Sequence, residues 1–488
     1  MSIQTVWQKL FSFFPGKPVV VEPQPTQATS DAGLLPIREF DERIGFTQQF
    51  AAAISDPREP SAVVHPVLDM VRMRVYGILA DYPDQDDHDL LRSDPVFKLI
   101  TGHSIRDGDL ASQPTLSRFE NFIDIPSLWR LRDVLIDQFL ASFSEPPRRI
   151  TLDIDVFDDP THGQQQLTFF HGYYDQYQYL PRVITCAEND LVVALTLLFG
   201  IASPVLGADE QLAYVVKRLR AAWPDVRIIV RGDSGFAVPL FYAACEQLGV
   251  EYTFGLRTNQ VLQRLSDALL AEAVAEYERS GLPQRRFTGF EYQAESWPEP
   301  RWVVAKAEAN AQGTNRRFVV TNRPGARVVP QAGYDDYAER GESENRNKEL
   351  KCGLQADRLS DHRFLANLFR LYLHSAAHNL LARLRSVVAQ PAPESPGREV
   401  PIEAQTEAQR RRYFNERRKR DPLGEGQPCT WRTRLIKVAA YVTESARRIV
   451  VRLPSHWPYL NHYVSVSDAV LNLPRAEPRA LGPHLRPP

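Results

Sequence analysis

The segment from Val226 to Gly235 has the sequence VRIIVRGDSG, an apolar run that ends at an aspartate, Asp233, flanked by glycines. The spacing of apolar residues predicts an amphipathic helix before it, at residues 209–223, and a second helix after it, at residues 236–248. Another strand is predicted at residues 250–256. Strands that alternate with helices in this way are typical of a sheet with parallel strands and helices packed on it.

The chain before this segment predicts additional strands of a different kind. In residues 149–156, apolar side chains at the even positions alternate with Asp153 and Asp155, which is the pattern of a half-buried strand. Two strand-like runs follow directly, at residues 179–187 and 191–199, with no helix between them. Together with the alternating region, they predict an α/β fold with a mixed sheet.

Composition excludes several classes of protein. The chain has 488 residues, of which 43% are hydrophobic and 24% are charged, and no stretch approaches the roughly 18 apolar residues of a membrane span. The first residues contain no apolar segment of the length that a secretory signal needs, so we expect a cytoplasmic protein. The four cysteines are isolated in the sequence, which argues against disulfides and against structural zinc.

The overall charge hides an uneven distribution. The formal net charge is only −2, yet residues 408–452 hold thirteen Lys and Arg against four Asp and Glu, and are therefore strongly basic. Two arginine-rich clusters begin this segment, and they are predicted to bind DNA phosphates. Their members are Arg410, Arg411, Arg412, Arg417, Arg418, Lys419 and Arg420. A helix is expected to follow at residues 431–446.

Two carboxylates fall where ligands bind in α/β sheets. Asp155 and Asp233 each lie at the end of a predicted strand, and strand ends form the ligand crevice of open α/β sheets. Paired carboxylates there favour a hard divalent cation such as Mg²⁺. A helix predicted after residue 334 places four functional side chains on one face, at offsets of 0, 3, 7 and 14. They are Tyr337, Arg340, Glu344 and Lys351.

These motifs resemble a known family. The spacing Y-x-x-R-x-x-x-E-x6-K, the strand ending in Asp155 and the segment RGDSGF around Asp233 are similar to the motifs of DDE transposases of bacterial insertion sequences, in the branch with a Tyr-Arg-Glu-Lys signature. The resemblance covers roughly residues 110–460. It implies a ribonuclease H-like mixed sheet with flanking helices, interrupted by a β-rich insertion, and an α-helical N-terminal domain.

The resemblance also implies roles for individual residues. Asp155, Asp233 and Glu344 would be the catalytic triad that binds two Mg²⁺ ions, for which Mn²⁺ can substitute. The other three residues of the Tyr-Arg-Glu-Lys motif, Tyr337, Arg340 and Lys351, would contact DNA phosphates. Asp153 is an alternative first ligand, because it points to the same side of its strand, and we favour Asp155.

The partners implied are the element's terminal repeats and target DNA, both double-stranded, and a second copy of the chain in the DNA complex. We expect a bacterial protein that associates with the nucleoid. Two other functions remain open. One is a metal-dependent nuclease that does not join strands, and the other is a repurposed transposase that only binds DNA.

The predicted organisation follows from changes in composition and periodicity. Residues 112–119, SQPTLSRF, are compatible with a helix-turn-helix, although plain helix packing is the favoured interpretation. The predicted units are a disordered N-terminal segment (1–36), a helical DNA-binding domain (37–148), a catalytic core (149–257 and 331–388) split by a β-rich insertion (258–330), a linker (389–407), a basic C-terminal region (408–473) and a disordered tail (474–488).

One cluster of aromatic residues lies close to the first aspartate in the sequence. We expect these side chains to pack against the protein and to cover a sheet edge, in preference to stacking on DNA bases. The cluster consists of Phe169, Phe170, Tyr173, Tyr174, Tyr177 and Tyr179.

Overall fold

A ten-stranded mixed sheet is the centre of the computed structural model, which describes residues 8–15, 17–23, 27–390 and 407–475. Its strands are β4 (Arg149–Val156), β5 (Asp159–Pro160), β6 (Phe169–His171), β7 (Gln176–Cys186), β8 (Val192–Phe199), β9 (Arg227–Gly232), β10 (Glu251–Leu256), β11 (Gln284–Tyr292), β12 (Arg301–Asn310) and β13 (Gly313–Thr321). They follow the order β11-β12-β13-β10-β9-β4-β7-β5, and β6 and β8 also pair with β7.

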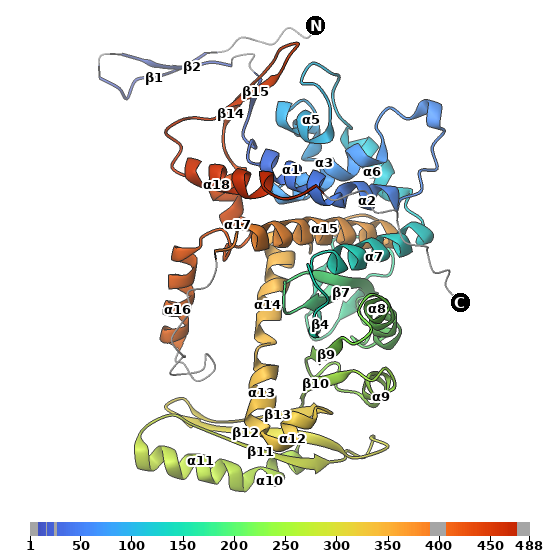
Figure 1. The fold of residues 1–488 in the computed structure, drawn as a ribbon, viewed down its shortest axis with the longest axis vertical. Coiled ribbons are helices and arrows are strands. Elements are labelled where there is room, and N and C mark those ends of the chain that lie inside the picture. The colour runs from blue at the N-terminus through green and yellow to red at the C-terminus, as the bar shows by residue number, and fades with distance from the viewer. Residues whose placement is uncertain (1–7, 16, 24–26, 391–406, 476–488) are drawn as a thin grey trace.

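The middle of this sheet confirms the predicted fold class. Strand β9 pairs in parallel with β4 and with β10, whereas β7 pairs antiparallel with β4 and with β8. Helices α8 (Ala208–Ala222) and α9 (Pro239–Gln247) lie on one side of these strands (Figure 1). Their apolar side chains share a core with the even-numbered residues of β4. The result is the predicted ribonuclease H-like mixed sheet with flanking helices.

The predicted β-rich insertion continues the same sheet. Strand β13 pairs antiparallel with β10, with Thr253 opposite Thr321, and β12 and β11 follow outward. Helices α10 (Gln260–Leu265) and α11 (Asp267–Ser280) cover this part at the lower end of the molecule (Figure 1). The insertion interrupts the sequence of the core, but its strands extend the core sheet.

Helices from both ends of the sequence form a layer above the sheet (Figure 1). The N-terminal ones are α1 (Leu34–Ile44), α2 (Phe46–Ala52), α3 (Val67–Leu79), α4 (His88–Leu91), α5 (Pro95–Thr101) and α6 (Gln113–Asn121), with a 3-10 turn at Pro60–Ala62. The next helix, α7 (Ile125–Leu140), packs directly on β8. The C-terminal ones are α17 (Pro428–Trp431), a π-helical turn at Arg432–Ile436, and α18 (Leu460–Leu471), whereas α16 (Glu407–Arg420) lies apart from the layer, at the left in Figure 1.

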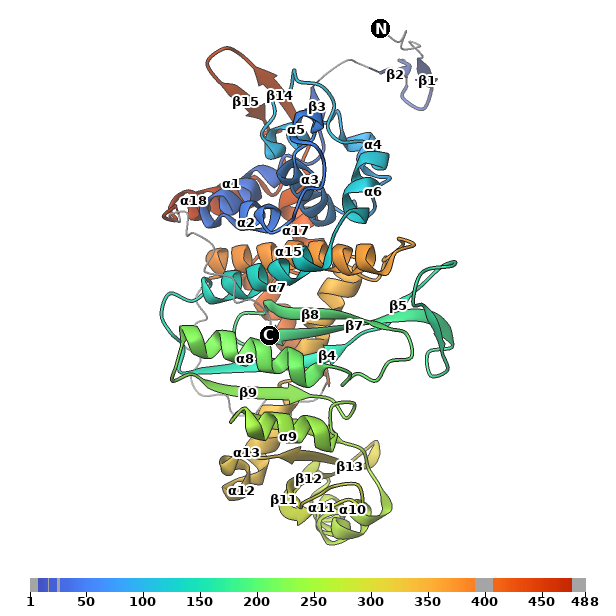
Figure 2. The same cartoon turned by 90° about the vertical axis from the view of Figure 1, so that its right-hand side faces the viewer.

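Helix α15 (Phe364–Val388) lies between this layer and the sheet (Figure 2). Its side chains are buried almost continuously from Ala366 to Leu384 and belong to the core of the helical layer. Toward the sheet, the Asn379 amide donates to the Val192 carbonyl and accepts from the Val192 N–H, both at 2.8 Å, which fixes α15 to β8. The helical layer and the catalytic sheet therefore share a central helix.

A buried ion cluster fixes α6 in the helical layer. Glu120 of α6 is fully buried and accepts from Arg74 of α3 at 2.7 Å and from Arg370 of α15 at 2.5 Å. Leu116 and Phe119 of α6 are also buried. This helix belongs to the segment that is compatible with a helix-turn-helix, and its buried side supports the packing interpretation.

Two predictions near the chain ends need correction. The segment 1–36 was predicted to be disordered, but its described part contains β1 (Lys9–Phe11), paired with β2 (Val19–Val21), and β3 (Ala28–Thr29). A helix predicted at residues 431–446 is replaced after Ile436 by β14 (Ala440–Glu444), which pairs with β3 and with β15 (Ile449–Arg452). The linker falls mostly, and the tail almost entirely, outside the described residues.

The long helix predicted from Tyr334 is divided. The structure has α12 (Pro324–Val328), α13 (Pro330–Ala338), α14 (Gly341–Lys348) and a π-helical turn at Glu349–Gly353. Helices α13 and α14 form a column on the side of the sheet opposite α8 and α9 (Figure 1). None of the helices in the described part of the chain combines the length and the apolar character that crossing a membrane requires.

Three buried histidines near α15 are held in the neutral form. Burial lowers the pKa of His374 to about 3, and burial also lowers the pKa of His378 and of His88. His88 Nε2 lies 3.2 Å from Arg74, which can only donate, so this nitrogen accepts and carries no proton. Protonating these rings would place uncompensated charge in the core.

We therefore expect stability to fall as the pH drops below about 6.5. The unfolded chain binds protons on these histidines near pH 6.5, whereas the folded chain binds them only at lower pH, so stability is lost as the pH falls. For His374 the loss continues toward pH 3, at about 1.4 kcal/mol per pH unit. Urea unfolding at a series of pH values measures the free energy of unfolding. In His374→Asn this free energy should fall less steeply with decreasing pH than in the wild type, by about 1.4 kcal/mol per pH unit. The exposed His456→Asn is the control; equal slopes in wild type and His374→Asn would contradict the assignment.

Candidate active site

Two aspartates meet at the ends of neighbouring parallel strands. In the register between β4 and β9, Ile154 lies opposite Gly232, so Asp155 and Asp233 occupy the next position on each strand. Asp233 is held in a turn, where its Oδ1 accepts from the Gly235 N–H at 2.9 Å. The structure thus brings together the two aspartates that the sequence predicted at the strand ends.

The Asp155 carboxyl group lies in a largely buried and negatively charged place. Burial raises its pKa to about 6, and the carboxylates of Asp233 and Glu344 contribute to the increase. Two neighbours oppose the increase: Arg340 lies 3.3 Å from Oδ2, and the Val156 N–H donates to Oδ1 at 2.9 Å. Asn347 also donates to Oδ2, at 3.0 Å. Asp233 and Glu344 thus lie close enough to Asp155 for their charges to affect its ionisation.

Glu344 approaches from the other side of the site. It lies on α14, its side chain is 61% exposed, and one oxygen lies 3.7 Å from Arg340. The Arg340 guanidinium therefore contacts two of the three predicted metal ligands at once. A positive charge already occupies the space between Asp155 and Glu344.

The remaining members of the Tyr-Arg-Glu-Lys motif surround this centre, although no single α-helix carries them. The Tyr337 hydroxyl lies over Gly255, where a Cβ would come within 2.6 Å of it, and burial raises the Tyr337 pKa. Lys351, in the π-helical turn, donates to Asp158 at 2.5 Å. The break after Ala338 and the π turn shift the spacing, yet all four side chains face the strand ends.

Asp153 has a different environment from Asp155. It is fully buried, and its carboxylate accepts from Arg231 at 2.7 and 3.0 Å and from Arg346 at 3.3 Å. Arg231 also donates to the backbone carbonyl of Asp336 in α13 at 2.6 Å. This network connects β4 and β9 to the α13–α14 column. It supports a structural role for Asp153 and leaves Asp155 as the available carboxylate.

The donor set at the strand ends has the chemistry that a divalent cation requires. Its ligands would all be carboxylate oxygens, as Mg²⁺ and Mn²⁺ prefer, and the Arg340 contact indicates that the place favours positive charge. Among the described residues, however, no group of three or more His, Cys, Asp or Glu side chains is arranged as a set that could hold a metal ion. Metal binding would therefore need Arg340 and the exposed Glu344 to change position.

Several neighbours of the site were not predicted from the sequence. Asn347 contacts Asp155 and lies three residues after Glu344, a spacing that could have identified it. Arg257 follows β10 and donates to the Ser234 hydroxyl at 3.4 Å. Tyr174 lies near Asp158, Asp233 and Asp155, and burial and these carboxylates raise its pKa. No local pattern marks Arg257, whereas Tyr174 belongs to the aromatic cluster that the sequence places close to Asp155, although it was expected to pack against the protein.

The basic segment forms a separate helix, α16, beside the α14 column (Figure 1). Arg412 pairs with Glu416 at 3.0 Å and Arg417 pairs with Glu425, whereas Arg418, Lys419 and Arg420 are exposed. The side chains of Arg410 and Arg411 lie outside the described residues. A cavity of about 470 Å³ lies between α16 and the α14 column, with Asn345 and Arg418 among its lining residues.

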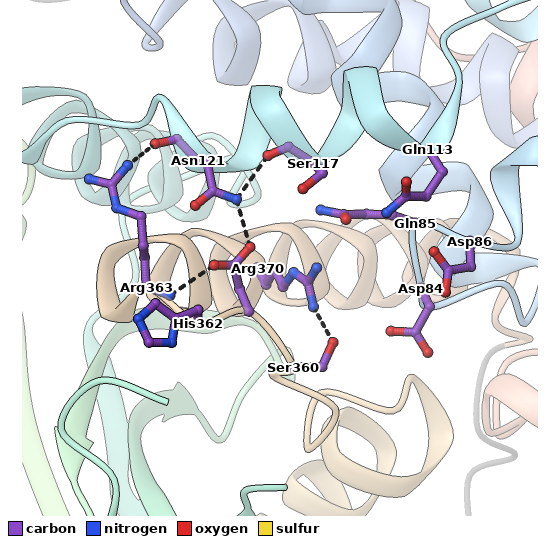
Figure 3. Close-up of a pocket in the computed structure, with 11 residues that line it drawn as sticks. Asp84, Gln85, Asp86, Gln113, Ser117, Asn121, Ser360, His362, Arg363 and Arg370 are labelled. Atoms are coloured by element: carbon purple, nitrogen blue, oxygen red, sulfur yellow. Dashed lines mark hydrogen bonds between the residues drawn. The ribbon is translucent and has the colours of Figure 1, made fainter. Parts of the chain in front are cut away.

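A second cavity, of about 530 Å³, lies far from the strand ends, between α6 and the start of α15 (Figure 3). Asn121 of α6 donates to Asp361 at 2.7 Å, and Arg370 donates to Ser360 at 2.6 Å. Asp84 and Asp86 line the opposite side, so acidic side chains flank its opening. The contact of Asn121 ties the end of α6 to the segment before α15, whereas Arg118 of the same helix is exposed.

Comparisons with known proteins identify a family for this chain. A family model described as transposase DDE domain group 1 matches residues 11–395. No curated protein matches the sequence. Among solved structures, the chain is similar to a piggyBac transposase synaptic complex with hairpin DNA, determined by cryo-EM. That similarity covers 80% of this chain and 82% of the other, at 14% sequence identity and a TM-score of 0.38.

Proposed function

The chain belongs to the family of transposases with a DDE domain, and from this we propose that it binds the terminal repeats of a bacterial insertion sequence, cleaves the DNA there and joins the freed 3′ ends to target DNA. The observation that carries the proposal is the meeting of Asp155 and Asp233 at adjacent strand ends, with Glu344 facing them from α14. A carboxylate set at that place suits phosphoryl transfer assisted by metal ions.

The three carboxylates would hold the divalent ions. When bound, two such ions activate a water for attack on the phosphodiester and stabilise the leaving 3′ oxygen. In the protein itself, Arg340 would exchange Asp155 for a DNA phosphate, since guanidinium groups bind phosphate oxygens in pairs of hydrogen bonds. Tyr337 and Lys351 would position neighbouring phosphates. The freed 3′-hydroxyl would then take the place of the water and attack target DNA.

The exposed cations of α16 would bind the DNA backbone outside the cleavage site. Arg418, Lys419 and Arg420 are consecutive exposed residues of one helix. Such contacts make affinity depend on salt, because each neutralised phosphate releases condensed counterions. Two copies of the chain would be needed to hold two element ends, so we propose a homodimer in the DNA complex.

This role predicts a smaller salt dependence when α16 is neutralised. Each of Arg418→Gln, Lys419→Gln and Arg420→Gln should lower the slope of log affinity against log salt by about 0.9 on duplex DNA, through one lost phosphate contact. Fluorescence anisotropy over a salt series measures the slope. The exposed Lys217→Gln on α8 is the charge-matched control. Slopes equal to wild type in all three variants would remove α16 from the interface.

The test of the proposed reaction uses DNA from both sides of the coding region. We expect specific binding, metal-dependent cleavage near the element ends, and joined products when pre-cleaved ends are supplied with a target plasmid. Cleavage without joining would identify a nuclease, and binding without cleavage would identify a DNA-binding protein. Absence of specific binding to either flank would contradict the proposal.

A further inference from the structure

The cluster of aromatic residues near the first aspartate is largely exposed in the structure. Tyr179 is buried, but Tyr173 is 85% exposed and Tyr177 is 58% exposed, and Phe169, Phe170 and Tyr174 are also exposed. The expected packing role therefore fails for most of the cluster. Exposed aromatic side chains that lie this close together are typical of a surface that binds a partner, because the partner removes their apolar area from water.

The exposed residues form a rigid hairpin. Strand β6 pairs with the start of β7, and the connecting turn is closed by hydrogen bonds from the N–H groups of Tyr174 and Asp175 to the His171 carbonyl, at 3.1 and 2.9 Å. Asp175 has a φ of 54°, a left-handed conformation that Asp tolerates better than most residues. These hydrogen bonds fix the backbone of the turn that carries the rings.

One side of the hairpin faces the carboxylates. Gln176 donates to Asp158 at 3.1 Å, and Asp158 is also the partner of Lys351. Burial raises the pKa of the Tyr174 hydroxyl, and the charges of Asp158, Asp233 and Asp155 contribute to the increase. The rings of His171 and Tyr174 lie 5.0 Å apart, as do those of Tyr174 and Tyr173. These three rings form an aromatic group beside the candidate active site, which we call the tip cluster.

The other side of the hairpin has its own aromatic pair. Phe170 lies opposite Tyr177 in the strand register, and their rings meet edge to face at 5.6 Å. Side chains alternate along a strand, so Tyr177 points away from the side that carries Gln176. The tip cluster and the Phe170–Tyr177 pair can therefore be tested separately.

We propose that the tip cluster stacks on unpaired bases of the DNA end held in the active site. The proposal rests on the proposed function. A phosphodiester at the carboxylates brings its flanking nucleotides next to Tyr174 and Tyr173, and every base has a flat face on which an aromatic ring can stack regardless of sequence. Strand breakage at an end is helped when the bases there leave the duplex, and the tip cluster offers the unpaired bases aromatic rings in place of the bases on which they were stacked.

The test compares two DNA substrates in a binding assay without divalent metal. One is a duplex from the flank of the coding region with a few unpaired nucleotides at its end, one of them 2-aminopurine, and the other is the same duplex fully paired. Tyr173→Ala and Tyr174→Ala should weaken binding of the forked DNA by about 5- to 150-fold for each lost stack, and restore 2-aminopurine fluorescence. Binding of the paired DNA should not change.

Three controls separate stacking from other effects. Tyr173→Phe and Tyr174→Phe keep the ring and should retain forked-DNA binding. Tyr441→Ala removes a tyrosine that is 60% exposed on β14, remote from the hairpin, and should have no effect. Tyr177→Ala, on the opposite side of the hairpin, should likewise leave forked-DNA binding intact.

Several results would overturn the proposal. Alanine variants that bind both DNAs as wild type does, or that weaken both equally, would exclude base stacking. A change in oligomeric state by light scattering, without any change in DNA binding, would identify the cluster as a protein interface. Each of these results is independent of wild-type cleavage, so failure of the tip cluster is distinguishable from failure of the proposed reaction.

Discussion

Glu344→Gln should bind DNA like the wild-type protein and lose DNA cleavage by more than about 100-fold. Loss of a residue that merely supports a metal ligand costs about 10–100-fold, so loss of the ligand itself should cost more. The substitution keeps the shape of a side chain that is already 61% exposed, so folding should not suffer. A nicking assay with Mn²⁺ or Mg²⁺ measures the loss, and anisotropy measures binding in parallel.

The control for this prediction is Glu278→Gln, which neutralises an exposed glutamate on α11, far from the strand ends. It should nick DNA at the wild-type rate. Asp233→Asn should behave like Glu344→Gln, because both would remove one oxygen ligand. Wild-type cleavage by Glu344→Gln would show that Glu344 is not a ligand, even if Asp233→Asn were inactive.

Asp153→Asn should lose about 3–5 kcal/mol of folding free energy, the cost of leaving buried charges without their partner. Asp153 is fully buried, and both Arg231 and Arg346 direct guanidinium groups at its carboxylate. Burial raises the pKa of Asp153, as it does for Asp155, but the ion pairs with Arg231 and Arg346 oppose that increase. Without the carboxylate, Arg231 loses its buried partner and Arg346 keeps only Asp190 as an ionic partner. Chemical denaturation at neutral pH measures the loss, and we expect the α13–α14 column to loosen first.

Asp155→Asn, only two residues away, should have the opposite effect on stability. The raised pKa of Asp155 means that the folded protein favours the neutral carboxyl group, so its ionisation costs stability as the pH rises from about 4 through 6. Asparagine resembles the neutral form and should therefore gain up to ~3 kcal/mol at neutral pH. At pH 3.5 or so the gain should vanish, while DNA cleavage should be lost at every pH.

These two variants decide which aspartate is the first metal ligand. A stable, inactive Asp155→Asn together with an unstable Asp153→Asn agrees with the geometry. A stable but inactive Asp153→Asn, with an active Asp155→Asn, would transfer the role to Asp153.

Local sequence patterns predicted the parts of the molecule in which neighbours along the chain determine the structure. Alternation at residues 149–156 and the apolar run before Asp233 predicted β4 and β9, and the parallel pairing of these strands is what brings Asp155 and Asp233 together. The spacing of Tyr337, Arg340 and Glu344 also marked three side chains that lie around one centre, but the single helical face expected to carry them is divided between α13 and α14. These features depend on periods of two and 3.6 residues, which a sequence displays directly.

The sequence did not predict which strands and which charged side chains pair when they lie far apart along the chain. Nothing near Asp153 indicates that Arg346, almost two hundred residues later, is its ion partner, and nothing near Thr321 indicates that β13 pairs with β10. The strand β14 replaced a predicted helix because its partner, β3, lies at the other end of the chain. Tertiary pairing overrides local propensity in such cases.

Contacts between the N-terminal and C-terminal parts of the chain determine when the protein can finish folding during its synthesis. Gly33 lies so close to the Leu435 carbonyl that a Cβ would clash with it, and the Ala32 N–H donates to the Val438 carbonyl at 3.2 Å. The N-terminal helices also need α15 to complete their core. At about 5–20 residues per second, a ribosome needs roughly 10–50 seconds between finishing α7 and finishing α15.

During that interval the first helices expose apolar surface that has no partner yet, which is the condition under which nascent chains recruit chaperones. A polypeptide that terminates before β14 would lack the strand on which β3 closes, and it should be degraded instead of accumulating as a partial protein. We therefore expect the chain to complete its fold only after β14 has been synthesised. By then all the residues of the candidate active site, which precede β14 in the sequence, are present.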